Sequence, residues 1–306
     1  MSNFWLNKSV LLVGGAGFIG SHTADLLLGD GAKVSIVDDF STGKVEYCDC
    51  RASLYELDAS TDISYVFDNE KPEIVMVFAS LVDVPTAIRY PLLTCKGISV
   101  TVNVLENCVK FAVQKILYAS SGYVYGNSDV IPTPEDAPLR PLNPYNIAKL
   151  AAEHYLSFFS EKYGLSCVSL RYAPTYGPRR MIGPIYDYIR CLVDGRQSNI
   201  YGEKTRDYIY VNDVARANLL AIENSKPNYI VLNIGTGQEI NLKTVYAQIA
   251  NLAGAQNDPI CHPSKTNEVE RFALDITKSR KEICFSPVIS LEMGLKKTID
   301  WVKHGC

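Results

Sequence analysis

A tyrosine and a lysine one helical turn apart are the residues in this chain whose types and spacing first suggest chemistry. Tyr145 and Lys149 lie in the stretch PYNIAK, which begins at Pro144. On a helix this spacing directs both side chains to the same face. Tyrosine, with an ordinary pKa near ~10, is a poor base at neutral pH, but a neighbouring cation lowers that pKa. The pair therefore predicts a general base, and an ordinary helix start is the alternative interpretation.

A glycine-rich turn near the N-terminus is a second chemical signal. Gly14, Gly17 and Gly20 follow one apolar run and precede a helical pattern, with the spacing G-x-x-G-x-x-G. Such glycines let backbone N–H groups approach a diphosphate at a helix N-terminus. The next apolar run ends in Asp38, whose carboxylate would bind ribose hydroxyls and repel a 2′-phosphate. Since no basic residue immediately follows Asp38, the pattern predicts NAD rather than NADP; a purely structural glycine turn is the alternative.

The elements that must position these residues alternate between short apolar runs and helical patterns. The apolar runs are VLLVGG, KVSIVDD, EIVMVFAS, KILYASS and CVSLRY, and helical patterns such as HTADLLLGDG and SVTVNVLENCVKFAV lie between several of them. This alternation predicts an α/β fold with a doubly wound parallel sheet of the Rossmann type. Strands that are apolar throughout fit burial on both faces of the sheet.

The second half of the chain has a less regular pattern. Prolines and glycines interrupt the segment from Pro174 to Pro184, and helical and strand patterns follow. We expect a smaller α/β C-terminal substrate domain that exchanges strands with the first domain. The predicted division assigns residues 1–170 plus 207–237 to the NAD-binding domain and residues 171–206 plus 238–306 to the substrate domain.

Composition excludes several classes of function. The chain has 306 residues, a net charge of -3 and 47% hydrophobic residues, as expected for a globular protein with a substantial core. Its mild acidity gives no basic surface for nucleic acid, and no apolar run reaches the ~20 residues of a membrane helix. The nine cysteines and four histidines are dispersed and form no metal-binding motif. Free thiols in a reducing cytoplasm are therefore expected.

Taken together, these motifs resemble the extended short-chain dehydrogenase/reductase family, and within it the nucleotide-sugar epimerases of the UDP-glucose 4-epimerase type. The resemblance covers nearly the whole chain. Besides PYNIAK, its carriers are GGAGFIG, DDFSTG, ELDAS, VFAS, SSGYVYG, LRYAPTYGPR, RDYIYVNDVARA, LNIGTG and RFALDITKS, in the family order. The resemblance implies a nucleotide sugar as substrate and NAD as cofactor.

The resemblance also assigns roles to individual residues. Tyr145 is expected to be the catalytic base, Lys149 to hold the nicotinamide ribose and lower the pKa of Tyr145, and Ser121 to relay the proton. A strand-end hydroxyl that satisfies local backbone groups is the alternative for Ser121. The expected cofactor-binding residues are Gly14, Gly17, Phe18, Ile19, Gly20, Asp38, Thr42, Gly43, Asp58, Ala59, Phe78, Ala79, Ser80, Tyr145, Lys149 and Tyr172. The expected substrate-binding residues are Val82, Ser121, Tyr145, Arg206, Lys265, Glu268 and Phe272. A packed core position is the alternative for Tyr172, and a solvated loop position for Lys265.

The residues after Ser121 decide among the reactions of this family. Its 4,6-dehydratases add an Asp-Glu pair there, and its decarboxylases usually place a glutamate at the second position, whereas this chain has Gly122 and Tyr123. Net reductases of the family tend to use NADPH, which Asp38 disfavours. Epimerisation at C4 of the sugar is therefore the expected activity. A dehydratase, decarboxylase or ketosugar reductase is the first alternative, and a non-catalytic NAD-sensing regulator the second.

Three departures from the family pattern bear on the substrate. Pro174 stands where the family usually has an asparagine, Gly97 replaces another common asparagine, and the segment Arg179–Arg190 is shorter than usual. UDP is the default nucleotide, and CDP, dTDP and GDP stay open. Phe272 is expected to flank the sugar and to disfavour a 2-N-acetyl group. The resemblance also implies a homodimer formed through the helices around 99–113 and 147–163.

Overall fold

The chain folds around a seven-stranded parallel sheet in a computed structural model that describes all residues except 1–3, 80–83, 227, 256, 265–268 and 305–306. The strands lie in the order β11-β6-β5-β4-β1-β2-β3. Their bounds are β1 (Ser9–Val13), β2 (Lys33–Asp38), β3 (Ser53–Glu56), β4 (Ile74–Val77), β5 (Lys115–Ser121), β6 (Ser166–Tyr172) and β11 (Tyr229–Ile234). The order changes direction between β1 and β4, and such a point leaves a crevice for ligands at the carboxyl ends of the strands. The predicted Rossmann-type sheet is confirmed.

Helices cover both faces of this sheet because successive side chains of a strand point in opposite directions. In β1, Val10 and Leu12 belong to one hydrophobic cluster, whereas Leu11 and Val13 belong to the other. The first face carries α1 (Phe18–Gly29), α7 (Val211–Asn224) and α9 (Thr277–Ile283), and the second carries α2 (Ser64–Glu70), α4 (Leu92–Lys110) and α5 (Pro144–Tyr163), with α3 (Val84–Arg89) packed against α5. Burial on both sides explains why the strands are apolar throughout.

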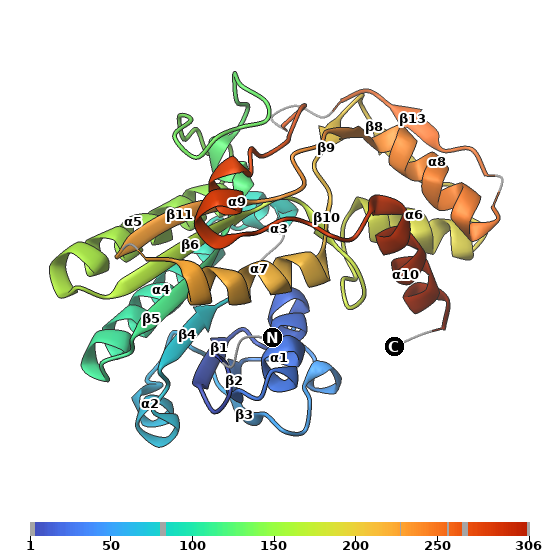
Figure 1. Cartoon of the computed structure of the whole chain (residues 1–306). Helices are drawn as coiled ribbons and strands as arrows, with labels where there is room; N and C mark the ends of the chain where they lie inside the picture. Colours follow the sequence, from blue (N-terminus) through green and yellow to red (C-terminus); the bar gives the residue numbers. More distant parts are fainter. Residues whose placement is uncertain (1–3, 80–83, 227, 256, 265–268, 305–306) are drawn as a thin grey trace.

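A smaller group of elements lies to one side of the sheet (Figure 1). A third hydrophobic cluster holds together α6 (Pro184–Val193), α8 (Leu242–Ala253) and α10 (Leu291–His304). Short strand pairs accompany them: β7 (Thr175–Tyr176) with β10 (Ile209–Tyr210), β8 (Asn199–Tyr201) with β13 (Ile260–His262), and β9 (Thr205–Arg206) with β12 (Ile240–Asn241). The chain enters this smaller lobe after β6 and returns to the main sheet through α7 and β11. It then adds β12, α8 and β13 to the smaller lobe, packs α9 against the main sheet, and ends with α10 in the smaller lobe. The numerical domain boundaries stay a prediction.

Candidate active site

The helix that carries Tyr145 and Lys149 begins where its sequence favours a helix start. The side chain of Asn143 caps α5 by accepting the backbone N–H of Asn146 at 3.0 Å, and Pro144 occupies the first turn, where its missing N–H costs nothing. Tyr145 is therefore in the first turn of α5, with Lys149 one turn later. The Lys149 ammonium lies 5.7 Å from the centre of the Tyr145 ring. The two side chains share one face, as the spacing predicts.

Lys149 is held from the strand side. Its side chain is buried, and Nζ donates a hydrogen bond to the carbonyl oxygen of Ala119 in β5 at 2.6 Å. Burial lowers the pKa of Lys149 to about 7, and the negative charge of Glu153 opposes that shift. The charge of this lysine is therefore sensitive to what binds beside it.

Ser121 lies at the carboxyl end of β5, where the 3-10 helix η2 (Gly122–Tyr125) begins. Its buried Oγ accepts the backbone N–H of Tyr123 at 3.2 Å. Such a contact with a local backbone group is the alternative role for Ser121. Because a hydroxyl has two acceptor lone pairs and a separate proton, that contact does not use the proton that a relay requires.

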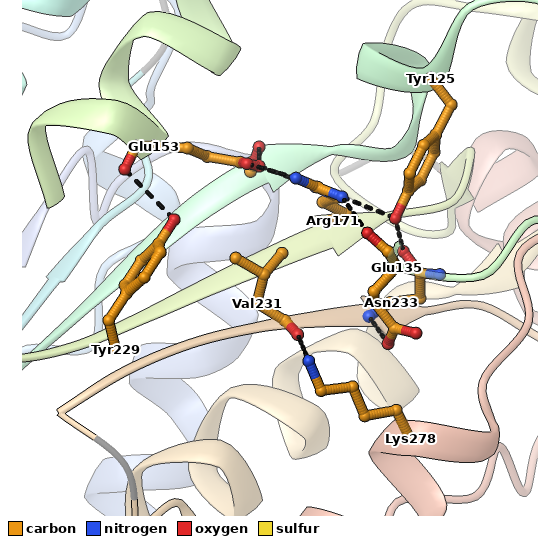
Figure 2. A network of polar contacts seen from close by, with 9 residues as sticks. Tyr125, Glu135, Glu153, Arg171, Tyr229, Val231, Asn233 and Lys278 are labelled. Atoms are coloured by element: carbon orange, nitrogen blue, oxygen red, sulfur yellow. Dashed lines mark hydrogen bonds and ion pairs between the residues drawn. The ribbon is translucent and has the colours of Figure 1, made fainter. Parts of the chain in front are cut away.

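A buried polar network ties these elements together (Figure 2). Glu153, one turn beyond Lys149 in α5, accepts hydrogen bonds from Ser120 Oγ at 2.5 Å and from Arg171 Nε and Nη2 at 3.0 and 2.7 Å. Arg171 Nη1 also donates to the hydroxyl of Tyr125 at 2.8 Å, and that hydroxyl donates to Asn233 Oδ1 at 2.8 Å. Helix α5 is thereby fixed to β5, β6 and β11. The strand that carries Ser121 and the helix that carries Tyr145 are held in one register.

Sequence reasoning missed this network, although a signal was present. Arg171 interrupts the otherwise apolar run CVSLRY, and a charge in a strand buried on both faces requires a partner. Glu153 continues the Tyr145–Lys149 stripe by one more turn. The pairing itself joins two elements that are separate in the sequence, so no local pattern identifies it.

The glycine turn between β1 and α1 has the geometry of a cradle for a diphosphate. A Cβ on Gly14 would lie 2.4 Å from the backbone nitrogen of Ala79, and one on Gly20 would lie 2.4 Å from the carbonyl oxygen of Gly14. Packing within the protein therefore requires both glycines. Among the described residues, a Cβ on Gly17 would meet only the carbonyl oxygen of Gly14, at 3.4 Å. The approach to Gly17, the N-cap of α1, is thus open to a ligand, which fits the close approach of an NAD diphosphate. Phe18 and Ile19 form the first turn of α1 and are half-buried.

Asp38 links the glycine turn to the end of β2. Its carboxylate oxygens accept the backbone N–H groups of Ala16 and Phe40, each at 2.9 Å. Burial raises the pKa of Asp38, and these hydrogen bonds oppose the shift. Gly43 packs here because a Cβ would lie 2.9 Å from Asp38 Oδ1, whereas Thr42 is exposed. Asp38 is thus placed at the end of β2, where an acid can bind a ribose.

A lysine that sequence reasoning missed lies beside Asp58, one of the expected cofactor-binding residues. Lys96 Nζ from α4 is 2.8 Å from Asp58 Oδ2 and 3.2 Å from Asp39 Oδ2. Burial alone would raise the pKa of Asp58, but the hydrogen bonds from Lys96 and Ser60 prevail and lower it to about 2. Ala59 is buried next to Asp58. Asp58 is therefore anionic at neutral pH.

The remaining expected cofactor residues differ in their surroundings. Phe78 and Ala79 follow β4, and both backbone N–H groups reach the carbonyl oxygen of Val13, at 2.7 and 3.0 Å. Tyr172 is buried at the end of β6, and its hydroxyl donates to Asn218 Oδ1 at 2.7 Å. That hydroxyl thus takes part in the packing of α7 on the sheet, the core position named as an alternative. Ser80 and Val82 lie outside the described residues.

Two of the expected substrate-binding residues gather around Tyr123, directly after Ser121. The Phe272 ring is buried 4.7 Å from the ring centre of Tyr123, and a Cβ on Gly122 would lie 2.7 Å from its Cζ. Gly122 therefore makes room for Phe272. The Arg206 guanidinium lies 6.0 Å from the centre of the Tyr123 ring. Lys265 and Glu268 lie outside the described residues.

Pro174 and Gly97 stand where the family commonly has asparagine. The carbonyl oxygen of Pro174 accepts the N–H of Ile209 at 3.1 Å, between β7 and β10. A Cβ on Gly97 would meet no atom of the described residues within 4 Å, so their packing does not require glycine at this position of α4. Elsewhere, each of the eight cysteines that the structure describes is free. No helix within the described ranges is long and apolar enough to cross a membrane.

Comparison with known proteins agrees with this geometry. The model of the NAD dependent epimerase/dehydratase family matches residues 10–235. A putative UDP-glucose 4-epimerase from Methanocaldococcus jannaschii is 33% identical, over 96% of this chain and 98% of its own length. A UDP-N-acetyl-alpha-D-glucosaminuronate decarboxylase from Bacillus cytotoxicus is 30% identical, over 98% of this chain and 99% of its own.

Two solved structures are similar over nearly the whole chain. The UDP-glucose 4-epimerase of Thermotoga maritima, solved with UDP-glucose, has a TM-score of 0.93 and 37% identity, covering 96% of this chain and 98% of that one. The UDP-glucose 4-epimerase of Thermus thermophilus, solved with NAD, has a TM-score of 0.88 and 31% identity, covering 95% of this chain and 97% of that one.

Proposed function

Since this chain belongs to the NAD dependent epimerase/dehydratase family and is an NAD-dependent epimerase of the UDP-sugar 4-epimerase group, we propose that it interconverts a UDP-hexose and its C4 epimer. The observation that carries this proposal is the placement of Tyr145, Lys149 and Ser121. Tyr145 and Lys149 share one face of α5, and Lys149 is bonded to β5, the strand that ends in Ser121. The glycine turn ends at the same edge of the sheet.

In the proposed mechanism, side chains of the protein transfer the proton. Tyr145 removes the proton of the sugar 4-hydroxyl and later returns it. Ser121 bridges the sugar 4-oxygen and the phenolic oxygen of Tyr145. Lys149 holds the nicotinamide ribose and, when protonated, lowers the pKa of Tyr145. Bound NAD supplies the hydride acceptor and then the hydride donor at sugar C4. The oxidised sugar turns between the two steps so that the opposite face is reduced.

A different reaction on the same sugar is the second candidate, because a decarboxylase is among the relatives. Gly122 and Tyr123 follow Ser121, where the family's 4,6-dehydratases have an acid pair and its decarboxylases usually a glutamate. Neither residue has a carboxylate. This favours epimerisation over dehydration and decarboxylation.

The substrate is proposed to lie between the carboxyl ends of the strands and the smaller lobe. Arg206 is assigned to phosphate, with Lys265 and Glu268 as further nucleotide contacts and Val82 and Phe272 beside the sugar. The buried stack of Phe272 on Tyr123 supports a sugar site next to Ser121.

A homodimer and a cytoplasmic location complete the proposal. Exposed apolar side chains on α5 include Ile147, Tyr155 and Phe158, with 53%, 42% and 52% of their surface accessible in one subunit. Helix α4 packs beside α5 and exposes Val109. A second copy that pairs with this surface would cover both helices about a two-fold axis. Free cysteines fit a reducing compartment.

Incubation with a panel of nucleotide sugars tests the proposed activity. Purified protein with NAD is mixed with UDP-, CDP-, dTDP- and GDP-linked sugars, and the products are identified by NMR. We expect conversion of UDP-glucose to its C4 epimer without net consumption of NAD. Loss of carbon dioxide or water from a substrate, with no epimer formed, would assign the second candidate instead.

A further inference from the structure

A segment of the smaller lobe, residues 177–183, docks on the face of α1 that begins at the glycine turn. The carbonyl oxygen of Pro178 lies 3.0 Å from His22 Nε2, and Arg179 Nη1 lies 2.8 Å from Asp25 Oδ2. The Arg180 guanidinium lies 5.3 Å from the centre of the Phe18 ring. Phe18, His22 and Asp25 follow one another at one-turn spacing, so the segment lies along a single stripe of the helix.

The backbone of this docking segment is unusual as well. Arg179 has a φ of 68°, in the left-handed region that costs a non-glycine residue about 1 kcal/mol or more. The contacts of Pro178 and Arg179 with α1 hold this conformation. As a result, the side chain of the next residue, Arg180, is delivered to the start of α1.

The two arginines of the segment differ in how their charges are neutralised. Arg179 forms an ion pair with Asp25. Among the residues that the structure describes, Arg180 has no carboxylate within ion-pair distance and its guanidinium, which lies over the Phe18 ring, makes no hydrogen bond. Burial lowers the pKa of Arg180, with weaker opposing effects from Tyr145, Tyr123 and Asp187. Arg180 is half-buried, and an anion that joined its guanidinium would offset the cost of removing this charge from water without a carboxylate partner.

The position of Arg180 indicates which kind of anion would neutralise its charge. Phe18 is the first residue of α1, directly after the open approach to Gly17. Tyr145, which acts on Arg180 electrostatically, is the residue proposed to carry the proton. The cation therefore lies beside the first residue of the proposed cofactor cradle, and the charge of the proposed base acts on it. Both ligands of the proposed reaction carry a diphosphate.

We infer that Arg180 binds a diphosphate group at the junction of the two lobes, opposite the N-terminus of α1. The inference rests on the proposed function, and it adds a binding residue that was not among those expected from the sequence. A planar guanidinium donates two parallel hydrogen bonds to phosphate oxygens, and the Phe18 ring orients that plane. Because Arg180 belongs to the smaller lobe, the bound diphosphate also joins this lobe to the sheet.

Binding measurements on Arg180 variants test the inference without requiring turnover. The variants are Arg180→Gln and Arg180→Lys, and the control is Arg190→Gln, which removes an exposed arginine of α6 that pairs with Asp194. The Kd of NADH is measured by fluorescence on protein freed of cofactor, and the Kd of UDP by calorimetry on NAD-loaded protein. We expect Arg180→Gln to weaken one of the two by about 10- to 100-fold, the scale of a hydrogen bond to a charged group. Arg180→Lys should recover part of this loss, and Arg190→Gln should change neither affinity.

The two ligands distinguish the source of the diphosphate. Weaker NADH binding assigns Arg180 to the cofactor, and weaker UDP binding on loaded protein assigns it to the substrate. If Arg180→Gln binds both NADH and UDP with affinities within about twofold of the wild type, the inference is overturned, even if the epimerase activity is present. If Arg180→Gln fails to fold, Arg180→Lys answers the same question, because it keeps the charge but loses the paired donors.

Discussion

The ammonium of Lys149 lies 5.7 Å from the centre of the Tyr145 ring. The ammonium also donates to a strand carbonyl, so its position is set by β5 as well as by its own helix. Because Lys149 is buried and its pKa is lowered to about 7, its amine is only partly protonated near neutral pH in the cofactor-free chain. Its effect on Tyr145 therefore depends on pH and on what binds beside it, and the first predictions concern this pair.

Replacing Tyr145 with phenylalanine removes the proton-transfer group and keeps the ring. We expect the variant to fold, to bind NAD, and to lose roughly 10²–10⁴-fold in kcat, the usual scale for a positioned acid or base. Ser121→Ala should slow turnover less, since its hydroxyl only relays and orients. The measurement is kcat on variants whose Tm is unchanged. Near-normal turnover by Tyr145→Phe would remove the base from the mechanism.

Replacing Lys149 with methionine should alter two properties of the enzyme. Cofactor binding weakens because the ribose contact is lost. The activity optimum moves to higher pH, because Tyr145 no longer has a neighbouring cation that lowers its pKa. Full pH profiles of kcat and the Kd of NADH check both effects. An unchanged optimum with weaker NADH binding would limit Lys149 to a structural contact with the cofactor.

The lowered pKa of Lys149 also predicts how stability depends on pH. Its pKa is about 7 in the folded chain and near ~10.4 in an unfolded one, so between these values the unfolded state binds more protons. Wild-type stability should then rise relative to Lys149→Met as the pH is raised from about 7 to 10, by up to about 1.4 kcal/mol per pH unit. Urea unfolding of cofactor-free protein at several pH values measures the difference. Parallel curves for the two proteins would show that Lys149 has an ordinary pKa.

Asp38 should determine the preference for NAD over NADP. Its carboxylate supports the glycine turn through Ala16 and carries the charge that repels a 2′-phosphate. Asp38→Ala should weaken NAD binding and relax the discrimination. Asp38→Asn keeps an acceptor of similar shape, so it should relax discrimination with a smaller loss of NAD affinity. Dissociation constants for NADH and NADPH provide the comparison, and tighter binding of NADPH by the wild type would contradict the prediction.

Phe272 should limit the size of the sugar. We expect the wild type to prefer UDP-glucose over UDP-N-acetylglucosamine, and Phe272→Ala to shift kcat/KM toward the N-acetylated sugar. Removal of this buried ring should also cost about 3–5 kcal/mol of stability. Phe285→Ala is a matched control, because Phe285 is fully buried in the same hydrophobic cluster. It should destabilise the protein without changing the preference. If the two variants give the same ratio of kcat/KM values, Phe272 has no role in sugar selection.

The sequence predicts those parts of the site that depend on local spacing. The sheet follows from alternating patterns, and the shared face of Tyr145 and Lys149 follows from one helical turn. Contacts between distant segments were not predictable in this way: the Arg171–Glu153 pair joins β6 to α5, and Lys96 reaches Asp58 from α4. Arg180 was missed for the same reason, because only the docked segment brings it to Phe18. The Tyr172 hydroxyl bonds to Asn218, which no pattern around Tyr172 indicates.

The buried Arg171–Glu153 pair has a consequence for how this protein tolerates mutation. Both side chains are almost completely desolvated, with 4% and 3% of their surface accessible. Losing one partner leaves an uncompensated charge in the interior and typically costs about 3–5 kcal/mol, whereas apolar replacement of both is often close to neutral. Neither single replacement on the way to an apolar pair is then easily accepted, and the final pair would also deprive Ser120 and Tyr125 of the hydrogen bonds that they share with these side chains. The ion pair thus resists replacement one residue at a time, and this resistance protects the alignment of α5 with β5 that the pair maintains.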